Sequence, residues 1–334
     1  MKTRIGRAMA LVAIASTALL VSSCGVETHK VKVDVSSKGT LRLAVVPKSV
    51  GLDYWEKVRR GAECAASKLD NVQITWNGVS DETNVAGQVD LLDNYIGQGV
   101  NGLVYAATDS TALVDITERA SSAGIKVINI DSGTDPQPKG VPLLATNNTK
   151  GALLAADALA KAVGPKGGKV AIVAFHAGSQ TNDQRVDGFK KGLKKHPKLK
   201  LVETQYSEND YNQALTVTQN ILTAHPDLKG IFAANEASDV GAVEAVRMSK
   251  KLGQVKLVGW DTSPDELEGV TAGDVYALVS QDPFRMGYDG VVSAEKSIRQ
   301  DKHLKNEDTG VVLVTRKNLK QRRVQQMVAP TCSR

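Results

Sequence analysis

The stretch Leu41-Arg42-Leu43-Ala44-Val45-Val46, followed at once by Pro47, is a short apolar run typical of a strand that is buried on both faces. Directly after it, positions 55, 58, 62, 65, 66 and 69 are apolar and recur at the spacing of one helix face. A buried strand followed by an amphipathic helix is the repeating unit of a parallel sheet covered by helices.

The rest of the chain repeats this unit in two series, which are separated by Asn147-Asn148. The first series continues with strands at 72–76, 102–105 and 126–130 and helices at 85–98 and 111–123. The second series comprises helices at 150–163, 183–195, 212–224 and 240–250 and strands at 169–175, 200–204, 230–233, 256–259 and 276–280. Two such series predict an α/β fold of two similar lobes, each a parallel sheet flanked by helices.

The first residues have the pattern of an export signal. Met1 to Arg7 is basic, and Ala8 to Leu20 is an apolar run of 13 residues, shorter than the roughly 20 that cross a bilayer. Val21-Ser22-Ser23-Cys24 resembles the bacterial lipobox, in which the cysteine is acylated. We therefore expect a lipoprotein signal peptide at 1–23, lipidation of Cys24 and a polar tether at 24–39. Such a protein would be lipid-anchored in the periplasm or on the outer face of the cell membrane.

Composition and charge exclude several classes. With 42% hydrophobic and 23% charged residues in 334, the chain is ordinary globular protein of about two domains, not a disordered or fibrous one. The formal charge is +6, but Lys2, Arg4 and Arg7 lie in the signal peptide, which leaves +3 on the remaining 311 residues. No nucleic-acid partner is expected from so weak a field.

The sequence motifs do not indicate a catalytic, cofactor or metal site. Gly97 to Gly102 fits GxGxxG, but it connects a predicted helix to a strand, the reverse of a dinucleotide site. The five histidines are scattered and no cysteine pair has metal spacing, so no metal, no cofactor and no enzyme activity are expected. Cys64 and Cys332 could form a disulfide that ties the tail to the first helix, a pairing that the sequence leaves open.

Polar and aromatic residues follow nearly every predicted strand. In open parallel sheets ligands bind beyond the carboxyl ends of the strands. The candidates at these ends are Lys48, Tyr54, Trp55, Asp109, Asp131, Asp183, Arg185, Asn235, Trp260, Asp261 and Gln281. Carboxylates, amides and a guanidinium pair with hydroxyl groups, and aromatic rings stack on the C–H face of a sugar. This set therefore predicts a small polyhydroxylated ligand in a crevice between the lobes.

Each of these residues also has a purely structural interpretation. Tyr54 and Trp55 could be core residues, and Arg185 could form a surface ion pair. Asp131, Asn235 and Asp261 could cap helices. Both interpretations stay open on the sequence.

Three stretches carry a resemblance to a known family: Thr218–Asp227, Ile231–Glu236 and Leu257–Asp265. They are similar to type I periplasmic binding proteins, in particular the ribose/galactose-type sugar receptors of ABC importers, and the similarity covers about 41–314. It implies lobes that close by a hinge and are joined by three crossovers, near Thr146, Gln281 and Gly310. The implied lobes are 40–146 with 282–310 and 147–281 with 311–334, in a monomer that serves a membrane permease.

The resemblance also implies roles. The family's aromatic stackers fall on Tyr54 and Trp55, and its hydroxyl-binding groups fall on Asp131, Arg185, Asn235, Trp260-Asp261 and Gln281. Ribose receptors have Asn where this chain has Leu52 and Ala106, and Arg where it has Ser132, so the identity of the sugar stays open. Lys48, Asp109 and Asp183-Gln184 resemble the branch that binds furanosyl signals of the autoinducer-2 type. That branch usually has Pro where this chain has Asn235, which makes it the alternative.

Overall fold

The computed structural model describes residues 39–302 and 304–332. The expected signal peptide, Cys24 and the tether up to residue 38 lie outside this range. Over the described part of the chain, none of the helices combines the length and apolar character that crossing a bilayer requires.

The first sheet has the strand order β11-β5-β4-β3-β1-β2, with every neighbouring pair parallel. Its strands are β1 (Leu41–Val46), β2 (Val72–Trp76), β3 (Gly102–Tyr105), β4 (Lys126–Ile130), β5 (Leu143–Ala145) and β11 (Glu307–Asp308). Its helices are α1 (Asp53–Lys68), α2 (Val85–Gly97), α3 (Val114–Ser122) and α9 (Pro283–Gln300). Along β1, Leu43 and Val45 pack with α1 and α9, whereas Ala44 and Val46 pack with α2 and α3. Helices thus cover both faces.

The second sheet repeats this order as β12-β10-β9-β8-β6-β7, with only β12 antiparallel to its neighbour among the described strands. Its strands are β6 (Gly168–Ala174), β7 (Leu199–Tyr206), β8 (Gly230–Ala233), β9 (Lys256–Trp260), β10 (Val275–Ser280) and β12 (Val312–Val314). Its helices are α4 (Asn148–Val163), α5 (Gln180–Leu193), α6 (Tyr211–Ala224), α7 (Glu236–Met248), α8 (Pro264–Ala272) and α10 (Arg322–Val328). The predicted α/β class with two similar lobes is confirmed.

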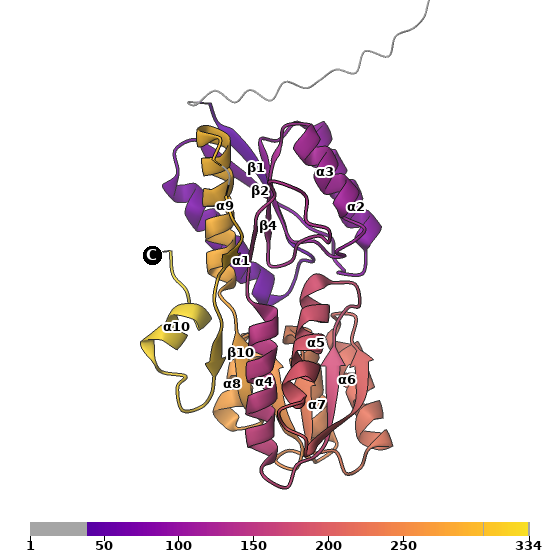
Figure 1. Cartoon of the computed structure of the whole chain (residues 1–334). Coiled ribbons are helices and arrows are strands. Elements are labelled where there is room, and N and C mark those ends of the chain that lie inside the picture. Colours follow the sequence, from indigo (N-terminus) through magenta and orange to yellow (C-terminus); the bar gives the residue numbers. More distant parts are fainter. Residues whose placement is uncertain (1–38, 303, 333–334) are drawn as a thin grey trace, which may run out of the picture. The chain divides into compact units, whose positions relative to one another are not determined.

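The described chain passes between the two sheets at three places, 146–147, 281–282 and 309–311. After the second passage α9 returns to the first lobe and packs along α1 (Figure 1). The two helices approach closely, because a Cβ added at Gly61 would lie 1.9 Å from the Phe284 carbonyl oxygen and one at Gly287 2.0 Å from that of Val58. Glycine at both positions therefore sets the spacing of this helix pair.

Several helices begin earlier than the apolar pattern predicts, and the difference is largest for α5 and α7. Helix α5 starts at Gln180 rather than 183, and α7 starts at Glu236 rather than 240. The first turn of α7 carries buried polar residues, and its N-cap is Asn235, whose side chain accepts a hydrogen bond from the Ser238 amide. Periodicity in apolar residues misses such turns, because tertiary contacts bury their polar side chains.

The patterns also gave no prediction for β5, α8, α9, β11, β12 and α10. Strand β11 has two residues, too few for a period to register.

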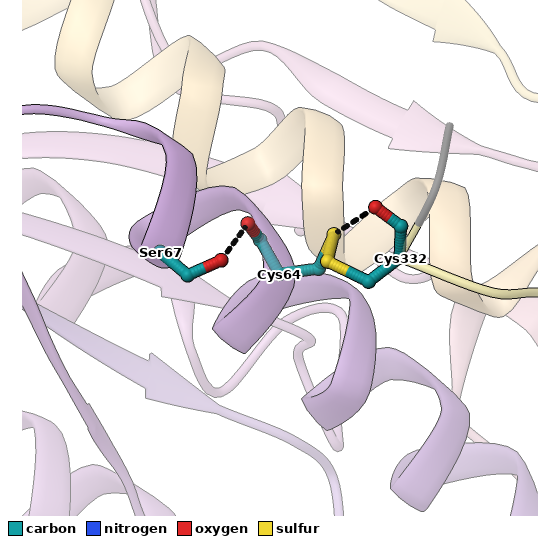
Figure 2. Close-up of a disulfide and its surroundings, with 3 residues drawn as sticks. All are labelled: Cys64, Ser67 and Cys332. Carbon is teal, nitrogen blue, oxygen red and sulfur yellow. Dashed lines mark hydrogen bonds between the residues drawn. A yellow bond between two sulfur atoms is a disulfide. The ribbon is translucent and has the colours of Figure 1, made fainter.

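A disulfide joins Cys64 in α1 to Cys332, so the pairing that the sequence left open is formed. Figure 2 shows the bond beside the Cys64 carbonyl oxygen, which accepts a hydrogen bond from the Ser67 hydroxyl.

Candidate ligand-binding site

The carboxyl ends of the strands of both sheets meet at a small cavity of about 30 Å³. The first lobe lines it with Lys48, Tyr54, Trp55, Glu82 and Asp131. The second lobe lines it with Phe175, Thr181, Arg185, Asn235, Asp261 and Gln281. The lining is mainly polar and charged, as the sequence-based set anticipated.

Two aspartates occupy matching positions in this lining. Asp131 follows β4 and Asp261 follows β9, and the two strands hold the same place in the order of their sheets. Both residues have a left-handed backbone, with φ of 60° and 89°. Their amides are held by carbonyl oxygens of the neighbouring strand, Leu144 for Asp131 and Val279 for Asp261. Left-handed backbone is costly for a residue with a Cβ, so these hydrogen bonds fix an unfavourable turn.

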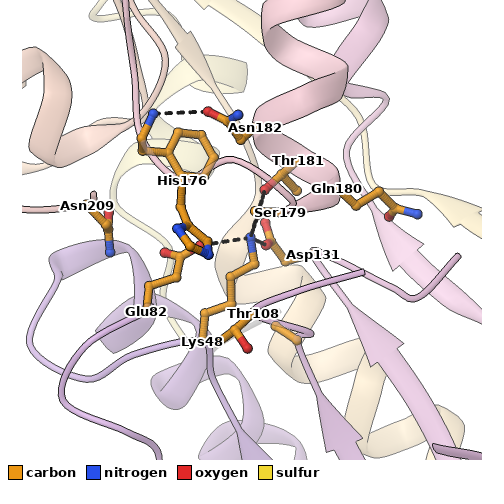
Figure 3. Close-up of polar contacts among 12 residues, drawn as sticks. Lys48, Glu82, Thr108, Asp131, His176, Ser179, Gln180, Thr181, Asn182 and Asn209 are labelled. Carbon is orange, nitrogen blue, oxygen red and sulfur yellow. Dashed lines mark hydrogen bonds and ion pairs between the residues drawn. The ribbon is translucent and has the colours of Figure 1, made fainter. Parts of the chain in front are cut away.

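In the first lobe Asp131 is paired on both of its oxygens. Its Oδ1 accepts a 2.8 Å hydrogen bond from the Tyr54 hydroxyl, and its Oδ2 lies 3.4 Å from Lys48 Nζ. Burial, and then the negative charge of Asp131, raise the pKa of Tyr54 well above its usual value. Tyr54 therefore stays a protonated donor. Glu82 adds a second carboxylate, 3.3 Å from Lys48 Nζ (Figure 3).

Lys48 also connects the lobes. Its ammonium group donates to Ser179 Oγ at 2.9 Å and to Thr181 Oγ1 at 2.7 Å, both in the second lobe (Figure 3). The side chain is 2% exposed. A buried ammonium requires such partners, since an unpaired charge is strongly destabilised away from water.

In the second lobe Arg185 is fixed from several sides. Its Nε donates to Asn148 Oδ1 and its Nη1 to the Ala234 carbonyl oxygen, each at 2.9 Å. The guanidinium carbon lies 4.3 Å from the Trp260 ring centroid and 5.4 Å from that of Phe175. Stacking on aromatic rings and hydrogen bonding together hold the guanidinium in one orientation.

Asp261 lies among other acids. Gln281 Nε2 donates to its Oδ1 at 2.7 Å, and the Glu236 amide donates to its Oδ2 at 3.3 Å. Burial raises the pKa of Asp261, against the positive charge of Arg185, which lowers it. Burial likewise raises the pKa of Glu266 and raises that of Asp239 to about 8. Asp261, which lines the cavity, is therefore surrounded by other buried carboxyl groups of the second lobe.

Glu236 belongs to the same group of acidic residues and contacts the first lobe. Its carboxylate accepts hydrogen bonds from the backbone amides of Asp53 at 3.2 Å and Tyr54 at 3.0 Å, at the start of α1. A negative charge at a helix N-terminus is stabilised by the amides that point at it. This contact and that of Lys48 join the lobes on either side of the cavity lining.

Some candidates combine a structural contact with a place in the lining. Tyr54 and Trp55 pack in the first-lobe core, and their rings meet edge to face at 4.9 Å. Asn235 caps α7 and also donates to Asn209 Oδ1. The structural and functional interpretations are therefore compatible at these residues.

Three sequence candidates do not line the cavity. Asp109 accepts hydrogen bonds from the Thr111 and Ala112 amides and caps its own loop. Asp183 is exposed, with Asn182 as a hydrogen-bond donor. Trp260 is fully buried, and its ring stacks against the Arg185 guanidinium.

Three lining residues were not among the candidates: Glu82, Phe175 and Thr181. Phe175 follows β6 and Thr181 lies in the first turn of α5, so the strand-end rule could have found both. Glu82 lies in the loop that follows the carboxyl end of β2, so the same rule covers this loop, although it does not single out Glu82 within it. Among the described residues, no group of three or more His, Cys, Asp or Glu side chains is placed to hold a metal ion.

Comparisons with known proteins agree with this architecture. A family model described as a periplasmic binding protein domain matches residues 43–302. The D-ribose/D-allose-binding protein of Pseudomonas aeruginosa is 33% identical over 261 residues, which are 76% of this chain and 81% of the relative. The ribose import binding protein of Bacillus subtilis is 30% identical over 264 residues, 79% of this chain and 84% of the relative.

Solved structures give the same picture. An ABC transporter solute-binding protein from Agrobacterium vitis with bound D-fucose superposes with a TM-score of 0.82 at 34% identity, over 86% of this chain and 99% of that one. A carbohydrate transporter solute-binding protein from Agrobacterium radiobacter, in complex with D-arabinose, has a TM-score of 0.83 at 31% identity, with the same coverage. By fold and by sequence, the chain belongs to the periplasmic binding protein domain family, as a type I member.

Proposed function

We propose that the protein captures a monosaccharide, a pentose or a hexose, between its two lobes and delivers it to an ABC importer. The observation that carries this proposal is the cavity at the strand ends of both sheets, where Asp131, Arg185 and Asp261 lie together. The relatives named above bind ribose or allose, and the solved neighbours hold fucose or arabinose.

The charges of the lining support a neutral ligand. The charged side chains in the described lining are Lys48, Glu82, Asp131, Arg185 and Asp261. Carboxylates outnumber cations in this set, so an anionic sugar would add a like charge to a buried site. Hydroxyl groups both donate and accept, and they can pair with either kind of group. Trp55 and Phe175 supply apolar surface for the C–H face of the ring.

Capture would proceed by closure of the lobes. The ligand binds mainly to one lobe while the cleft is open, and closure then adds the hydrogen bonds of the other lobe and expels water. The contacts from Lys48 to Thr181 and from Glu236 to the Tyr54 amide would form in the same step. Affinity in the micromolar to nanomolar range, about −8 to −12 kcal/mol, suits such a receptor.

The same proposal includes export and anchoring. The signal peptide would be removed before Cys24, and acylation of this residue would hold a monomeric, non-catalytic receptor on the outer face of the membrane. More than one acyl chain is needed for firm attachment. Cys24→Ala should release the mature protein from the membrane fraction, and retention of that variant there would contradict the anchor.

A thermal-shift screen followed by calorimetry tests the ligand. D-ribose, D-allose, D-fucose, D-arabinose and a furanosyl autoinducer-2 compound form the panel. Asp131→Ala and Trp55→Ala should each weaken binding of the best sugar more than tenfold, whereas Asp187→Asn, exposed on α5, is the control without effect. Preference for the furanosyl compound would favour the signalling alternative. A chemically altered sugar recovered from the protein would indicate an enzyme.

A further inference from the structure

The Cys64–Cys332 disulfide joins elements that belong to different lobes. Cys64 lies in α1, whose Val58 and Ala62 pack in the core of the first lobe. Cys332 follows α10, whose Val324 and Val328 pack in the core of the second lobe with strand β10. The bond is therefore a fourth connection between the lobes, added to the three passages of the described backbone, and it links residues 268 positions apart.

The chain segment that connects the disulfide to the second lobe is short. The disulfide lies only four residues, 329–332, beyond the end of α10. Fully extended, these residues would span at most about 14 Å. The segment before α10 is itself held to the second lobe, because the side-chain amide of Asn318 donates to the Leu313 carbonyl oxygen at 2.8 Å. Gln325 Nε2 donates to the Leu319 carbonyl oxygen at 2.7 Å within the same segment. The distance from Cys64 to the second lobe is thus bounded.

Helix α1, which carries Cys64, also carries two residues of the cavity lining. Tyr54 and Trp55 lie in the first turn of α1, and Cys64 follows Trp55 by nine residues, about 13.5 Å along the helix axis. At its first turn α1 donates the Asp53 and Tyr54 amides to Glu236 of the second lobe. Opening of the cleft must break these two hydrogen bonds while the far part of α1 stays tied through Cys64.

We propose that the disulfide is a covalent strap that limits how far the lobes open and thereby raises ligand affinity. A bond that removes widely open conformers from the sugar-free protein enlarges the fraction that is close to the binding-competent form, and apparent affinity scales with that fraction. The effect on affinity rests on the proposed function. The effect on lobe opening does not, because it concerns the sugar-free protein.

Two variants of the mature chain test the strap. The double variant Cys64→Ser/Cys332→Ser removes the bond, and insertion of Gly-Ser-Gly-Ser between Pro330 and Thr331 keeps the bond but lengthens its tether. Both should increase the radius of gyration of the sugar-free protein in small-angle X-ray scattering. Both should speed hydrogen exchange of the Asp53 and Tyr54 amides, and weaken binding of the best sugar of the panel about three- to tenfold.

The outcomes distinguish a disulfide that limits lobe opening from one that only stabilises the C-terminal segment. A lower melting temperature with unchanged radius of gyration, exchange and affinity would overturn the proposal. If the serine variant fails to fold, the insertion variant decides, and wild-type values for it in all three measurements also overturn the strap. Wider opening in a protein that binds no sugar of the panel would support the strap and contradict the proposed function instead.

Discussion

Asp131 and Asp261 stand at the same position in the two lobes, with the same left-handed backbone, yet their surroundings differ. Asp131 has a hydroxyl and an ammonium as partners, from Tyr54 and Lys48. Asp261 has an amide and a guanidinium near it, but also the buried acids Glu236, Asp239 and Glu266. The repeated fold thus supplies two equivalent carboxylate positions, and the surrounding side chains decide their chemistry.

The difference suggests that the two lobes contribute carboxylates of different character to the cleft. The first lobe offers a carboxylate whose partners are already in place, whereas the charge of the second lobe's carboxylate depends on pH and on Arg185. Four predictions test this comparison, from the largest expected effect to the smallest.

Arg185→Met should weaken sugar binding at least about a hundredfold, because it leaves Asp261 among acids without its guanidinium and removes a donor from the lining. Lys48→Met should weaken it only about tenfold, since Tyr54 still donates to Asp131. Calorimetry at pH 7 on variants with native circular dichroism measures both. Equal losses for the two variants would remove the proposed difference between the lobes.

Asp261→Asn should weaken binding about tenfold at pH 8 and much less at pH 5. Burial raises the pKa of Asp261, so lowering the pH neutralises this carboxyl group in the wild-type protein sooner than it would an ordinary aspartate. Wild-type affinity should accordingly fall as the pH is lowered, and the variant should show a flatter profile. Parallel pH profiles for the two proteins would show that Asp261 is not the group responsible.

Asp239→Asn should stabilise the protein at pH 8 by about 1 kcal/mol or more and have little effect near pH 4. The pKa of Asp239 rises from 3.8 to about 8 on folding, because the carboxyl group is buried. Between these values the folded state binds a proton that the unfolded state has lost, so stability falls as the pH rises through this window. Denaturant unfolding at both pH values measures the difference. A variant less stable than wild type at pH 8 would contradict the prediction.

Glu236→Gln should weaken binding about threefold. The carboxylate accepts the Asp53 and Tyr54 amides across the cleft, and the amide side chain keeps only one acceptor oxygen for them. The control is Glu244→Gln, since Glu244 lies on the same helix and pairs with Arg247 instead. Hydrogen exchange of the two amides should speed up in the first variant only. Unchanged exchange would mean that Glu236 does not stabilise the contact between the lobes.

The sequence by itself determined the alternation of strands and helices, several strands to the residue, and the gathering of polar side chains at the strand ends. Apolar periodicity and the residues next to each strand are local properties, so they can be read without knowing the partners. Eight of the eleven expected residues line the cavity for this reason, among them Asp131, Arg185 and Asp261.

Only the tertiary structure decided the rest. It put Glu82 beside Lys48, placed Trp260 under Arg185, and joined Cys64 to Cys332. It also began α5 and α7 with buried polar turns. Each of these features depends on which distant segments meet, because burial, charge pairing and stacking are properties of the contact and not of either residue alone.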